Sequence, residues 1–586
     1  MNRTRLIAAV GVAVAALLPF VLGPYWVTLL AYAGTSTLAA LGLVLLTGVG
    51  GLTSFGQAAF VGIGAYATAW YTTALGGSPW VGLLLGLAVA GVVALLLGAA
   101  TLRLSGHLLP LSTVAWGLAL FFLFGNLTML GRHTGISAIP SVRLGPLSLG
   151  SAVGSYYLVW VVTGGVLLLA GNLLRSRQGR AIRALRGGSA MAESLGIDTF
   201  RVRLAVFVVS ALSAALSGWL YAHLQGVISP SAFDLGAGIE YLFMAMLGGA
   251  GHVGGALLGA LLVTFAREGL QDALSGFGAA SGEAEVVLFS TLFIIVLQTA
   301  RGGVIPALSR LLPRPVPPLP APAAPLPRRT QPEKGAELLR VEALRRRFGG
   351  LTAVNDVSFS LAGGEILGLI GPNGAGKSTI FNLLSGSLRP DAGEVRFRGL
   401  DISGLPARRI AALGLARTFQ HVRLRPEMTL LENVMLGAHL RGRAGMLRGA
   451  LGLDRAEERR FAAEAMRALA RVGLAAAPHE LAGSLPLGQQ RLLELARALA
   501  ADPALVVLDE PAAGLRRPEK LELSALLQSL RAEGLTLLLV EHDMEFVMGL
   551  VDRVVVLDFG VKLAEGLPAE IQADSRVREA YLGGVA

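Results

Sequence analysis

Long apolar runs follow one another through the first 300 residues, and no acidic residue occurs before Glu193. Most of these runs approach the ~20 residues that a helix needs to cross ~30 Å of hydrocarbon. The pattern therefore predicts a polytopic α-helical membrane domain over residues 1–312. The expected spans lie near residues 6–22, 26–47, 57–75, 81–101, 108–129, 155–173, 203–225, 238–249, 253–267 and 286–300.

The number of spans is left between eight and ten. The run at 238–249 is short, and the Gly-rich segments at 48–64 and 247–255 are compatible with broken or re-entrant helices. Small residues at 247–260 predict close helix packing, because membrane helices associate without a hydrophobic gradient between them. Glu240 lies near the start of an apolar run, where an ionisable group is either functional or placed at the membrane interface.

Arginine residues predict the orientation of this domain. Arg3 and Arg5 precede the first run, and basic residues mark cytoplasmic loops, so the N-terminus is expected in the cytoplasm. A cleaved secretory signal is the alternative for residues 1–22, since an A-x-A pattern follows at 31–33. We reject it because that pattern lies inside the next apolar run.

The densest basic stretch also falls on the cytoplasmic side, because six expected spans precede it. Its middle, "GRAIRALRGGSAMAESLGI", has helical character that Gly187 and Gly188 interrupt. The stretch is either an ordinary basic loop or a short helix that docks on a cytoplasmic partner domain. Its arginines are Arg175, Arg177, Arg180, Arg183, Arg186, Arg201 and Arg203.

Composition changes sharply after residue 312. Residues 313–332 contain nine prolines, which favours an extended, semi-rigid spacer, and we take 313–336 as a linker. Beyond it, residues 337–586 alternate apolar strands with charged helices, as in an α/β domain. A stretch at about 434–484 is rich in Ala, Arg and Glu with apolar residues at helical spacing, which predicts a helical subdomain.

Composition and charge exclude several classes of protein. Hydrophobic residues make up 53% and charged residues 15%, which is too apolar for disorder. The chain has no cysteine, so a disulfide scaffold and Cys-ligated metal sites are excluded. The net charge of +11 is spread unevenly, with +7 in residues 1–312, +3 in 313–336 and +1 in 337–586. The basic excess lies beside apolar segments, so no nucleic-acid partner is expected.

A phosphate-binding loop follows the strand-like "EILGLI". Its glycines let backbone N–H groups curl around phosphates at a helix N-terminus, Lys377 is placed to reach the β- and γ-phosphates, and Ser378 offers a hydroxyl to Mg²⁺. The sequence therefore predicts a nucleotide site with ATP and Mg²⁺ as ligands. Its residues are Gly371, Pro372, Asn373, Gly374, Ala375, Gly376, Lys377, Ser378 and Thr379.

A second half of this site is expected where "ALVVLDE" ends. Asp509 and Glu510 follow a buried strand, at the edge where a parallel sheet presents ligands. Asp509 suits Mg²⁺, directly or through water. Glu510 suits the activation of a water molecule, because phosphoryl transfer needs an oriented nucleophile and neutralised charge.

The order of these motifs resembles that of an ABC-transporter ATPase. The resemblance rests on "RFGGLTAVNDVSF", the P-loop, "ARTFQ", "LPLGQQRLLELARAL", the Asp509–Glu510 strand end and "LLLVEHD". It implies that Phe348 stacks on adenine, and that Gln420 senses the γ-phosphate, contributes to the metal site and contacts the membrane domain. It also implies that His542 clamps the γ-phosphate and that a signature loop, including Leu485, Gly488 and Gln489, completes a partner's site.

Finer motifs resemble the branched-chain amino-acid uptake systems. The cytoplasmic half shares "GLARTFQ" and "DEPAAGL" with their ATP-binding subunit, and "GLTSFGQAAFVGIGAYATA" and "IEYLFMAMLGGAGHVGGALLGALLV" look like their membrane subunit. The resemblance implies a fused permease and ATPase that imports branched-chain or related hydrophobic amino acids across the cytoplasmic membrane. It further implies a second permease, a second ATPase, an extracytoplasmic solute-binding protein and surrounding lipid.

Two alternatives to this function remain. The same machine imports urea, short amides or aromatic acids in similar-looking systems, and the sequence does not separate these cargoes. A regulator that senses the membrane without moving solute is the alternative from another class, although the many Gly-rich spans favour a translocation path.

Two departures from the general ABC pattern predict unequal ATP sites. Pro486 stands where the signature loop usually carries Ser, and proline offers neither a hydroxyl nor an N–H to a phosphate. Arg516 and Arg517 stand where the family usually has Asn-Pro. The alternative is that Gly488 and the helix N-terminus still serve the phosphate.

Overall fold

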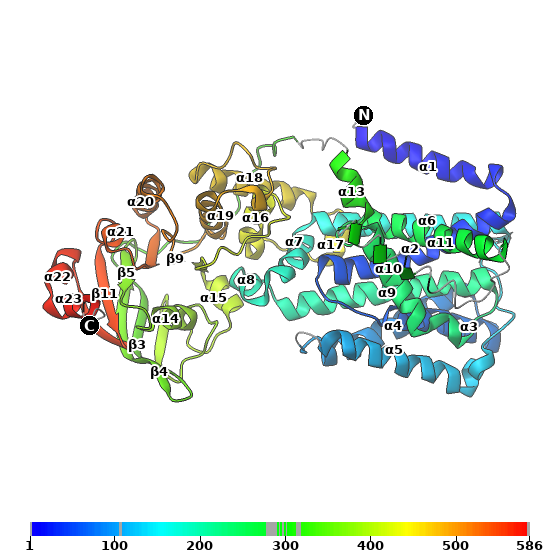
Figure 1. The fold of residues 1–586 in the computed structure, drawn as a ribbon, viewed down its shortest axis with the longest axis horizontal. Coiled ribbons are helices and arrows are strands. Elements are labelled where there is room, and N and C mark those ends of the chain that lie inside the picture. Colours follow the sequence, from blue (N-terminus) through cyan, green and yellow to red (C-terminus); the bar gives the residue numbers. More distant parts are fainter. Residues whose placement is uncertain are drawn as a thin grey trace. The chain divides into compact units, whose positions relative to one another are not determined.

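The computed structural model describes residues 3–104, 108–276, 302–311 and 318–582, and a few positions between 287 and 299. The chain divides into two compact units, each described here by itself (Figure 1). Unit 1 comprises Met1–Arg175 and Phe200–Pro315, and unit 2 comprises Ser176–Thr199 and Val316–Ala586. Residues 176–199 are thus grouped with unit 2, although they connect two helices of unit 1.

Unit 1 is a bundle of apolar helices. Each of the first nine expected spans coincides with one of them, and the tenth, 286–300, lies largely outside the described residues. The helices are α1 (Arg3–Val21), α2 (Pro24–Leu43) with a π-helical continuation η1 (Val44–Val49), α3 (Gln57–Ala74), α4 (Pro79–Thr101), α5 (Leu108–Asn126), α6 (Ala152–Arg175), α9 (Thr199–Gln225), α10 (Leu235–Gly249), α11 (Val253–Gly276) and α13 (Val304–Leu311).

Among the described residues, six helices are long and apolar enough to cross a membrane, namely α2 with η1, α4, α5, α6, α9 and α11. The stretch Gly11–Val21 and α10 are apolar but shorter. Between α5 and α6 the chain forms two 3-10 turns, η2 (Thr128–Leu130) and η3 (Arg132–Thr134), and a small hairpin of β1 (Arg143–Leu144) and β2 (Leu147–Ser148).

The two Gly-rich segments interrupt helices, as the sequence allows. Residues 50–56 separate η1 from α3, and residues 250–252 form the turn between α10 and α11. Close contacts explain the small residues around that turn. A Cβ at Gly248 would lie 1.8 Å from the carbonyl oxygen of Gly255, and one at Gly259 would lie 1.8 Å from that of Met244. Only glycine permits the two helices to approach so closely.

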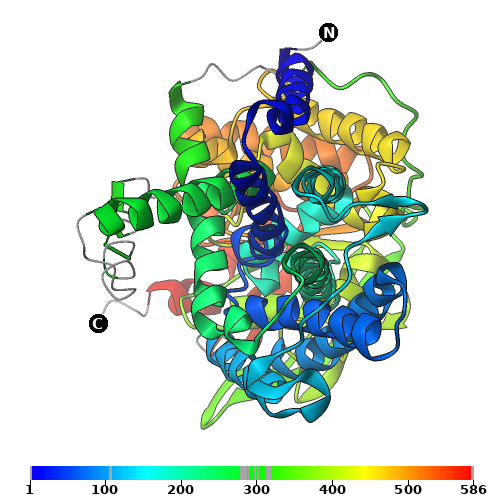
Figure 2. The same ribbon diagram turned by 90° about the vertical axis from the view of Figure 1, so that its right-hand side faces the viewer.

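Helices α2, α6 and α9 lie side by side in unit 1 with their axes roughly aligned, and α2 and α9 are the more buried of the three (Figures 1 and 2). Buried polar groups join them to each other and to α3. Gln57 Nε2 donates to the carbonyl oxygens of Ala39 (3.0 Å) and Ser210 (3.2 Å), and Ser213 Oγ donates to that of Leu38 (2.7 Å). Such bonds satisfy polar groups that lipid cannot hydrate.

Unit 2 is built on two sheets. The six-stranded sheet has the order β12-β11-β5-β10-β9-β8, parallel except for β12, and the four-stranded antiparallel sheet has the order β4-β3-β6-β7. The strands are β3 (Glu337–Phe348), β4 (Leu351–Ala362), β5 (Ile366–Ile370), β6 (Ala392–Phe397), β7 (Leu400–Asp401), β8 (Leu415–Arg417), β9 (Leu505–Asp509), β10 (Thr536–Val540), β11 (Arg553–Asp558) and β12 (Val561–Gly566).

The helices of unit 2 cover these sheets and form a separate helical region. The buried strands β5, β9 and β10 are apolar at every position or nearly so, as parallel strands covered on both faces are. The helices are α7 (Arg177–Ala184), α8 (Ser189–Ser194), α14 (Lys377–Leu384), α15 (Ala407–Leu413), α16 (Leu430–Gly437), α17 (Met446–Ala450), α18 (Arg455–Arg471), α19 (Leu487–Ala500), α20 (Arg517–Ala532), α21 (Met544–Met548), α22 (Pro568–Ala573) and α23 (Ser575–Leu582).

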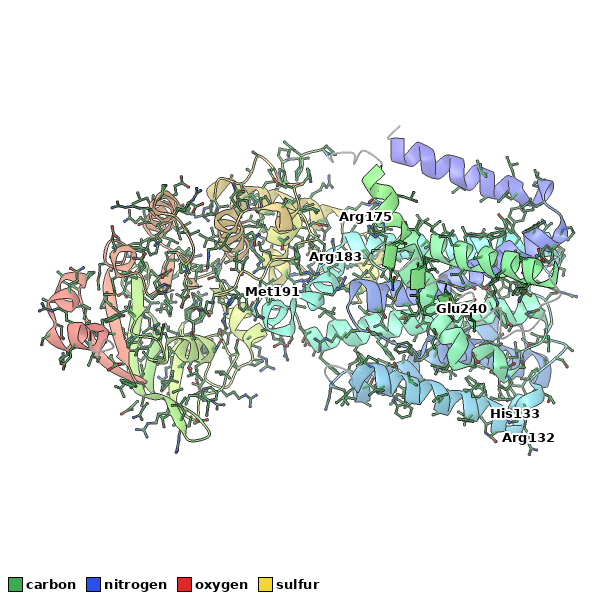
Figure 3. The ribbon with its side chains drawn as sticks, viewed as in Figure 1. Arg132, His133, Arg175, Arg183, Met191 and Glu240 are labelled. Carbon is green, nitrogen blue, oxygen red and sulfur yellow. The ribbon has the colours of Figure 1, made fainter. Side chains whose placement is uncertain are left out.

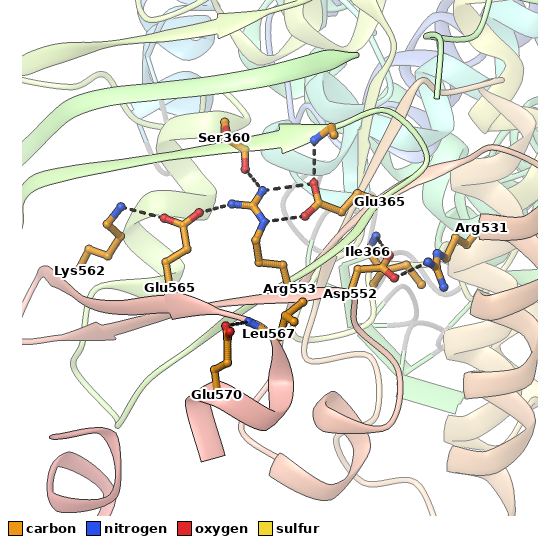
Figure 4. Close-up of polar contacts among 11 residues, drawn as sticks. Ser360, Glu365, Ile366, Arg531, Asp552, Arg553, Lys562, Glu565, Leu567 and Glu570 are labelled. Carbon is orange, nitrogen blue, oxygen red and sulfur yellow. Dashed lines mark hydrogen bonds and ion pairs between the residues drawn. The ribbon is translucent and has the colours of Figure 1, made fainter. Parts of the chain in front are cut away.

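A polar network holds the beginning of β5 in place (Figure 4). Arg553 Nε lies 2.8 Å from Glu365 Oε1, its Nη2 donates to the carbonyl oxygen of Ser360 (2.6 Å), and it also pairs with Glu565. Asp552 Oδ2 accepts the N–H of Ile366 (2.9 Å). Strand β5, which leads into the P-loop, is therefore anchored at the end opposite that loop.

The second half of the Pro-rich segment belongs to unit 2 and packs on its core. Leu326 is buried in the core of this unit, and Arg441 Nη2 donates to the carbonyl oxygen of Pro327 (3.1 Å). The backbone N–H of Arg329 bonds to the carboxylate of Asp502. Proline-rich backbone leaves its carbonyl groups unpaired by itself, and these contacts satisfy part of them.

Candidate functional site

The P-loop joins β5 to α14, as the sequence predicts. Gly371, Gly374 and Gly376 have φ angles of 154°, 87° and 96°, a region that favours glycine. A Cβ at Gly371 would lie 2.2 Å from the carbonyl oxygen of Leu557, and one at Gly376 would lie 2.4 Å from that of Ala353. Glycine is required at both positions, and the loop presents its backbone ahead of a helix N-terminus, where anions bind.

Lys377 is buried in the first turn of α14. Its Nζ donates to the carbonyl oxygens of Gly371 (2.6 Å) and Pro372 (2.9 Å). Burial lowers the pKa of Lys377, and the carboxylates of Glu510 and Asp509 oppose that effect. The Lys377 ammonium group is thus hydrogen-bonded to carbonyl oxygens of the P-loop. Phosphate oxygens bound in the loop would compete for the same ammonium group. The neighbouring Asn373, Gly374 and Ser378 are exposed, Ala375 is buried and Thr379 is half-buried.

Asp509 ends β9 with its carboxylate almost fully buried. Its Oδ1 accepts no hydrogen bond within the part of the chain that the structure describes. Burial raises the pKa of Asp509 to about 6; Arg417 lowers it, Glu510 and Glu541 raise it further, and Arg491 lowers it. A buried carboxylate oxygen without a donor fits a hard cation such as Mg²⁺, which prefers oxygen ligands.

Glu510 and Gln420, taken from separate motifs, meet in the structure. Gln420 Nε2 donates to Glu510 Oε2 (3.0 Å). Glu510 has a φ of 47°, an uncommon conformation outside glycine that clusters at functional sites, and its N–H donates to the carbonyl oxygen of Val540 (2.8 Å). The backbone of Glu510 is therefore held by β10 while its side chain reaches the loop after β8.

His542 lies two residues beyond β10 and is exposed. Its backbone N–H donates to Glu541 Oε2 (3.1 Å), and its Nδ1 lies 3.6 Å from the same oxygen. Glu541 is fully buried, and its Oε1 accepts the N–H of Ala512 (2.7 Å), so it ties the His542 backbone to the loop after Glu510. Burial raises the pKa of Glu541.

Three site residues escaped the sequence analysis. Glu541 is one; the only signal for it is an acid directly before His542. Thr418 Oγ1 accepts the N–H of Asp509 (3.2 Å), and Arg491 Nη1 donates to the carbonyl oxygen of Glu510 (2.8 Å). Thr418 makes its contact from the end of the neighbouring strand β8, and Arg491 makes its contact from α19. Single-sequence reasoning has no way to pair these residues with Asp509 and Glu510.

Phe348 ends β3 and is exposed, with 44% of the residue's surface accessible. The guanidinium carbon of Arg346 lies 5.0 Å from the ring centroid, an arrangement typical of a cation–π contact. The exposed ring is available for stacking on a planar base.

The signature loop lies at the start of α19, where Pro486 is the N-cap. Leu485 is buried, Gln489 is exposed, and Gly488 lies in the first helical turn, where backbone N–H groups have no intrahelical partner. A Cβ at Gly488 would lie 3.0 Å from Glu519 Oε1. Arg516, at the N-cap of α20, pairs with that carboxylate (3.2 Å).

Three family models match the chain. That for the permease component of branched-chain amino acid transport systems covers residues 25–297, and that for ABC transporters covers 354–513. A model for branched-chain amino acid ATP-binding cassette transporters covers 561–586. Over 251 residues the chain is 46% identical to the high-affinity branched-chain amino acid transport ATP-binding protein LivG of Salmonella typhimurium, which spans 42% of this chain and 98% of that relative. The chain belongs to the branched-chain amino acid ABC transporters.

A second relative extends this similarity. The corresponding protein BraF of Pseudomonas aeruginosa is 43% identical over 249 residues, which is 42% of this chain and 98% of BraF. Both relatives match the ATPase part alone, and the permease part rests on its own family model. This ABC transporter chain therefore joins a permease region to a region that hydrolyses ATP, as the sequence predicted.

The basic stretch between α6 and α9 forms a docking segment, residues 176–199. It consists of α7, a 3-10 turn η4 (Leu185–Gly187) and α8, with the interruption at Gly187 and Gly188 that the sequence predicts. Figure 3 labels Arg183 on α7 and Met191, which is fully buried, on α8. The structure thus favours a docking helix over an ordinary basic loop.

Arginine side chains attach the docking segment to the helical region of the ATPase. Arg180 makes a bidentate pair with Glu458 (2.6 and 3.1 Å) and lies 5.7 Å from the ring centroid of Phe461. Arg177 donates to the carbonyl oxygens of His439 (2.7 Å) and Ala444 (2.8 Å). Together these contacts join α7 to α18 and to the chain that precedes it.

The middle of the docking segment reaches the loop of Gln420. A Cβ at Gly187 would lie 3.2 Å from Cδ of Arg425, and one at Gly188 would lie 3.8 Å from Nη1 of Arg423. These arginines follow Gln420 by three and five positions. The docking segment therefore contacts the stretch of chain that directly follows Gln420.

Proposed function

We propose that this chain imports branched-chain amino acids across the cytoplasmic membrane, as one half of an ATP-driven transporter. The observation that carries the proposal is the attachment of the docking segment to the ATPase, through Arg180 and Glu458, in a chain with both family regions. The relatives named for branched-chain amino acid transport support the cargo.

In the nucleotide site, each residue that the motifs identify has its own proposed role. The P-loop, from Gly371 to Thr379, binds the phosphates, Lys377 adds positive charge, and Phe348 stacks on the base. Glu510 orients the attacking water with Gln420 beside it, and His542 contacts the γ-phosphate. These roles follow the motifs, and the contact between Gln420 and Glu510 supports a shared site.

Ser378, Gln420 and Asp509 are the proposed ligands of Mg²⁺. The bound cation neutralises charge on the phosphates during transfer. Asp509 supports this assignment, because its buried Oδ1 lacks a donor among the described residues.

Members of this family act as dimers with a substrate-binding protein. For this chain we propose a second permease, a second ATPase and an extracytoplasmic solute-binding protein. The signature residues Leu485, Gly488 and Gln489 then complete the partner's ATP site. We place the N-terminus and the ATPase in the cytoplasm, because in the sequence Arg3, Arg5 and the arginines of the docking segment flank apolar runs that would cross the inner membrane.

The test is radiolabelled uptake in vesicles that contain the assembled transporter and its binding protein. We expect uptake of leucine and valine and little uptake of urea. Lys377→Ala should lose nucleotide binding, and Glu510→Gln should bind ATP without turning it over, each lowering uptake about 100-fold or more.

The matched control is Lys562→Ala, since Lys562 pairs with Glu565 on the surface (2.8 Å). It should leave uptake unchanged. Full uptake by Lys377→Ala or Glu510→Gln would overturn the assignment, and uptake of urea without leucine would replace the cargo.

A further inference from the structure

A cavity of about 740 Å³ lies in unit 1 beside α10. This volume falls in the ~300–1,000 Å³ range of small-molecule sites. Its walls come from elements far apart in sequence, including α2, α9 and α11. Residues that line it include Ser36, Tyr221, Phe233, Tyr241, Glu240 and Arg267.

Opposite charges line one side of this cavity. Arg267 Nη1, on α11, lies 3.2 Å from Glu240 Oε2, on α10, and the two side chains are 52% and 27% exposed. Figure 3 labels Glu240 within unit 1. Glu240 is the only charged residue of α10, and Arg267 is the only basic residue of α11. Ionisable groups inside apolar helices are costly and mark functional sites by default.

The packing of α10 on α11 has another cause. Gly248 and Gly259 bring the two backbones into direct contact near the turn, at the other end of the hairpin from Glu240. A pair of accessible charges adds little to such packing, because water competes for both groups. The packing of α10 on α11 therefore does not explain why Glu240 and Arg267 are charged.

Apolar and aromatic side chains line the cavity next to the pair. They include Phe233, Ile239, Phe243 and Met244. A ligand that is complementary to the charged pair and to the apolar wall carries a positive group, a negative group and an apolar part. A neutral solute such as urea can hydrogen-bond to these two groups, but it forms no ion pair with either of them.

We propose that Glu240 and Arg267 bind the head group of the transported amino acid inside the permease. Glu240 receives the α-ammonium group, Arg267 receives the α-carboxylate in a two-pronged contact, and the side chain of the solute lies on the apolar wall. Binding of the solute opens the contact between Glu240 and Arg267. This inference rests on the proposed function, since it names the site that the proposed cargo uses.

The position of the pair suits delivery from outside. With the proposed orientation, α9 ends and α10 begins on the extracytoplasmic side. Glu240 lies in the second turn of α10, toward the face on which a binding protein releases its solute. The site would thus be the first in the permease to receive the amino acid.

The experiment compares leucine uptake with ATP turnover stimulated by the loaded binding protein, in the complete transporter. Glu240→Gln and Arg267→Gln should each lower uptake about tenfold or more, because each removes one charge-assisted contact to the solute. ATP turnover should continue, so that fewer leucine molecules move per ATP. Glu240→Asp, which keeps the charge, should retain more uptake than Glu240→Gln.

Two further variants separate recognition from structure. Glu268 is next to Arg267 in the sequence but does not line the cavity. Glu268→Gln should therefore leave uptake unchanged. The exchange Glu240→Arg with Arg267→Glu restores an ion pair but reverses its direction, so uptake should stay low.

Several results would overturn the proposal. Recovery of uptake by the exchange variant would show that the pair is only structural, as would loss of ATP turnover together with uptake in Glu240→Gln. Uptake of more than about half the wild-type rate by Glu240→Gln would also reject it. If the unchanged transporter takes up no leucine, the proposed function itself fails, which is a separate result.

Discussion

Replacing Asp509 by asparagine should stabilise the nucleotide-free protein while it abolishes transport. Burial raises the pKa of Asp509 to about 6, against an ordinary value of 3.8. The folded state therefore binds this proton more tightly than the unfolded chain does. The resulting stability is fully present below about pH 4 and is lost as the pH rises through about 6. At about 1.4 kcal/mol per pKa unit, the ionised carboxylate costs unit 2 about 3 kcal/mol at neutral pH.

Asparagine is neutral and nearly the same size, so it removes most of this cost. In a domain of this size, about 3 kcal/mol raises the unfolding midpoint by at most about 6–12 °C. The assay is thermal unfolding of the purified full chain at pH 7.5 with a chelator and no nucleotide, at one heating rate, because unfolding of large proteins is often irreversible. Adding Mg²⁺ and ATP should stabilise the wild-type protein much more than the variant.

Asp401→Asn is the matched control of opposite sign. Hydrogen bonds from Ser403 hold the pKa of Asp401 below its ordinary value, so this change should bring no stabilisation. The reasoning is refuted if Asp509→Asn is no more stable than wild type at pH 7.5, or if its gain is the same at pH 4.5.

Three other predictions concern coupling and symmetry. Arg180→Ala removes one partner of a largely buried pair, which typically costs about 3–5 kcal/mol, and the lower end applies because Glu458 is 18% exposed. Uptake should fall while ATP turnover continues, and a double-mutant cycle with Glu458→Ala should show strong coupling; additive effects would contradict the pairing. Cysteines at 176 and 449 should cross-link under mild oxidation, because a Cβ at Gly449 would lie 2.9 Å from that of Ser176 and a small shift brings the pair to the about 3.5–4.5 Å that a disulfide needs. The chain has no other cysteine. An active protein that shows no cross-link would argue against docking. Because proline offers a phosphate neither a hydroxyl nor an N–H, we expect Pro486 to weaken the ATP site that uses this chain's signature loop. Glu510→Gln should then stop nearly all turnover, and the matching change in the partner ATPase should leave a substantial part. Equal losses would reject this asymmetry.

The expected spans illustrate what local pattern can determine. Helices α4, α5 and α6 could be placed within a few residues. A helix in lipid must form all its backbone hydrogen bonds internally, so a long uninterrupted apolar run identifies it in the sequence. The P-loop was equally predictable, since its glycines, Lys377 and the flanking strand and helix lie within one short stretch. The short α10 and the segment at 50–56 were left open, because small residues permit both a straight helix and an interrupted one.

Long-range contacts decided the rest. The sequence by itself determined a membrane domain, a nucleotide-binding loop, the acids Asp509 and Glu510 and a basic stretch between two spans, because each depends on neighbours in the chain. Only the tertiary structure brought Gln420 to Glu510, Arg180 to Glu458 and Arg267 to Glu240. Burial, which depends on residues distant in the chain, is the largest cause of the raised pKa of Asp509. Periodicity and motif spacing indicate which residues are buried or reactive. The partner of a charged side chain depends on how elements that are distant in the sequence pack together, and no local pattern contains that information.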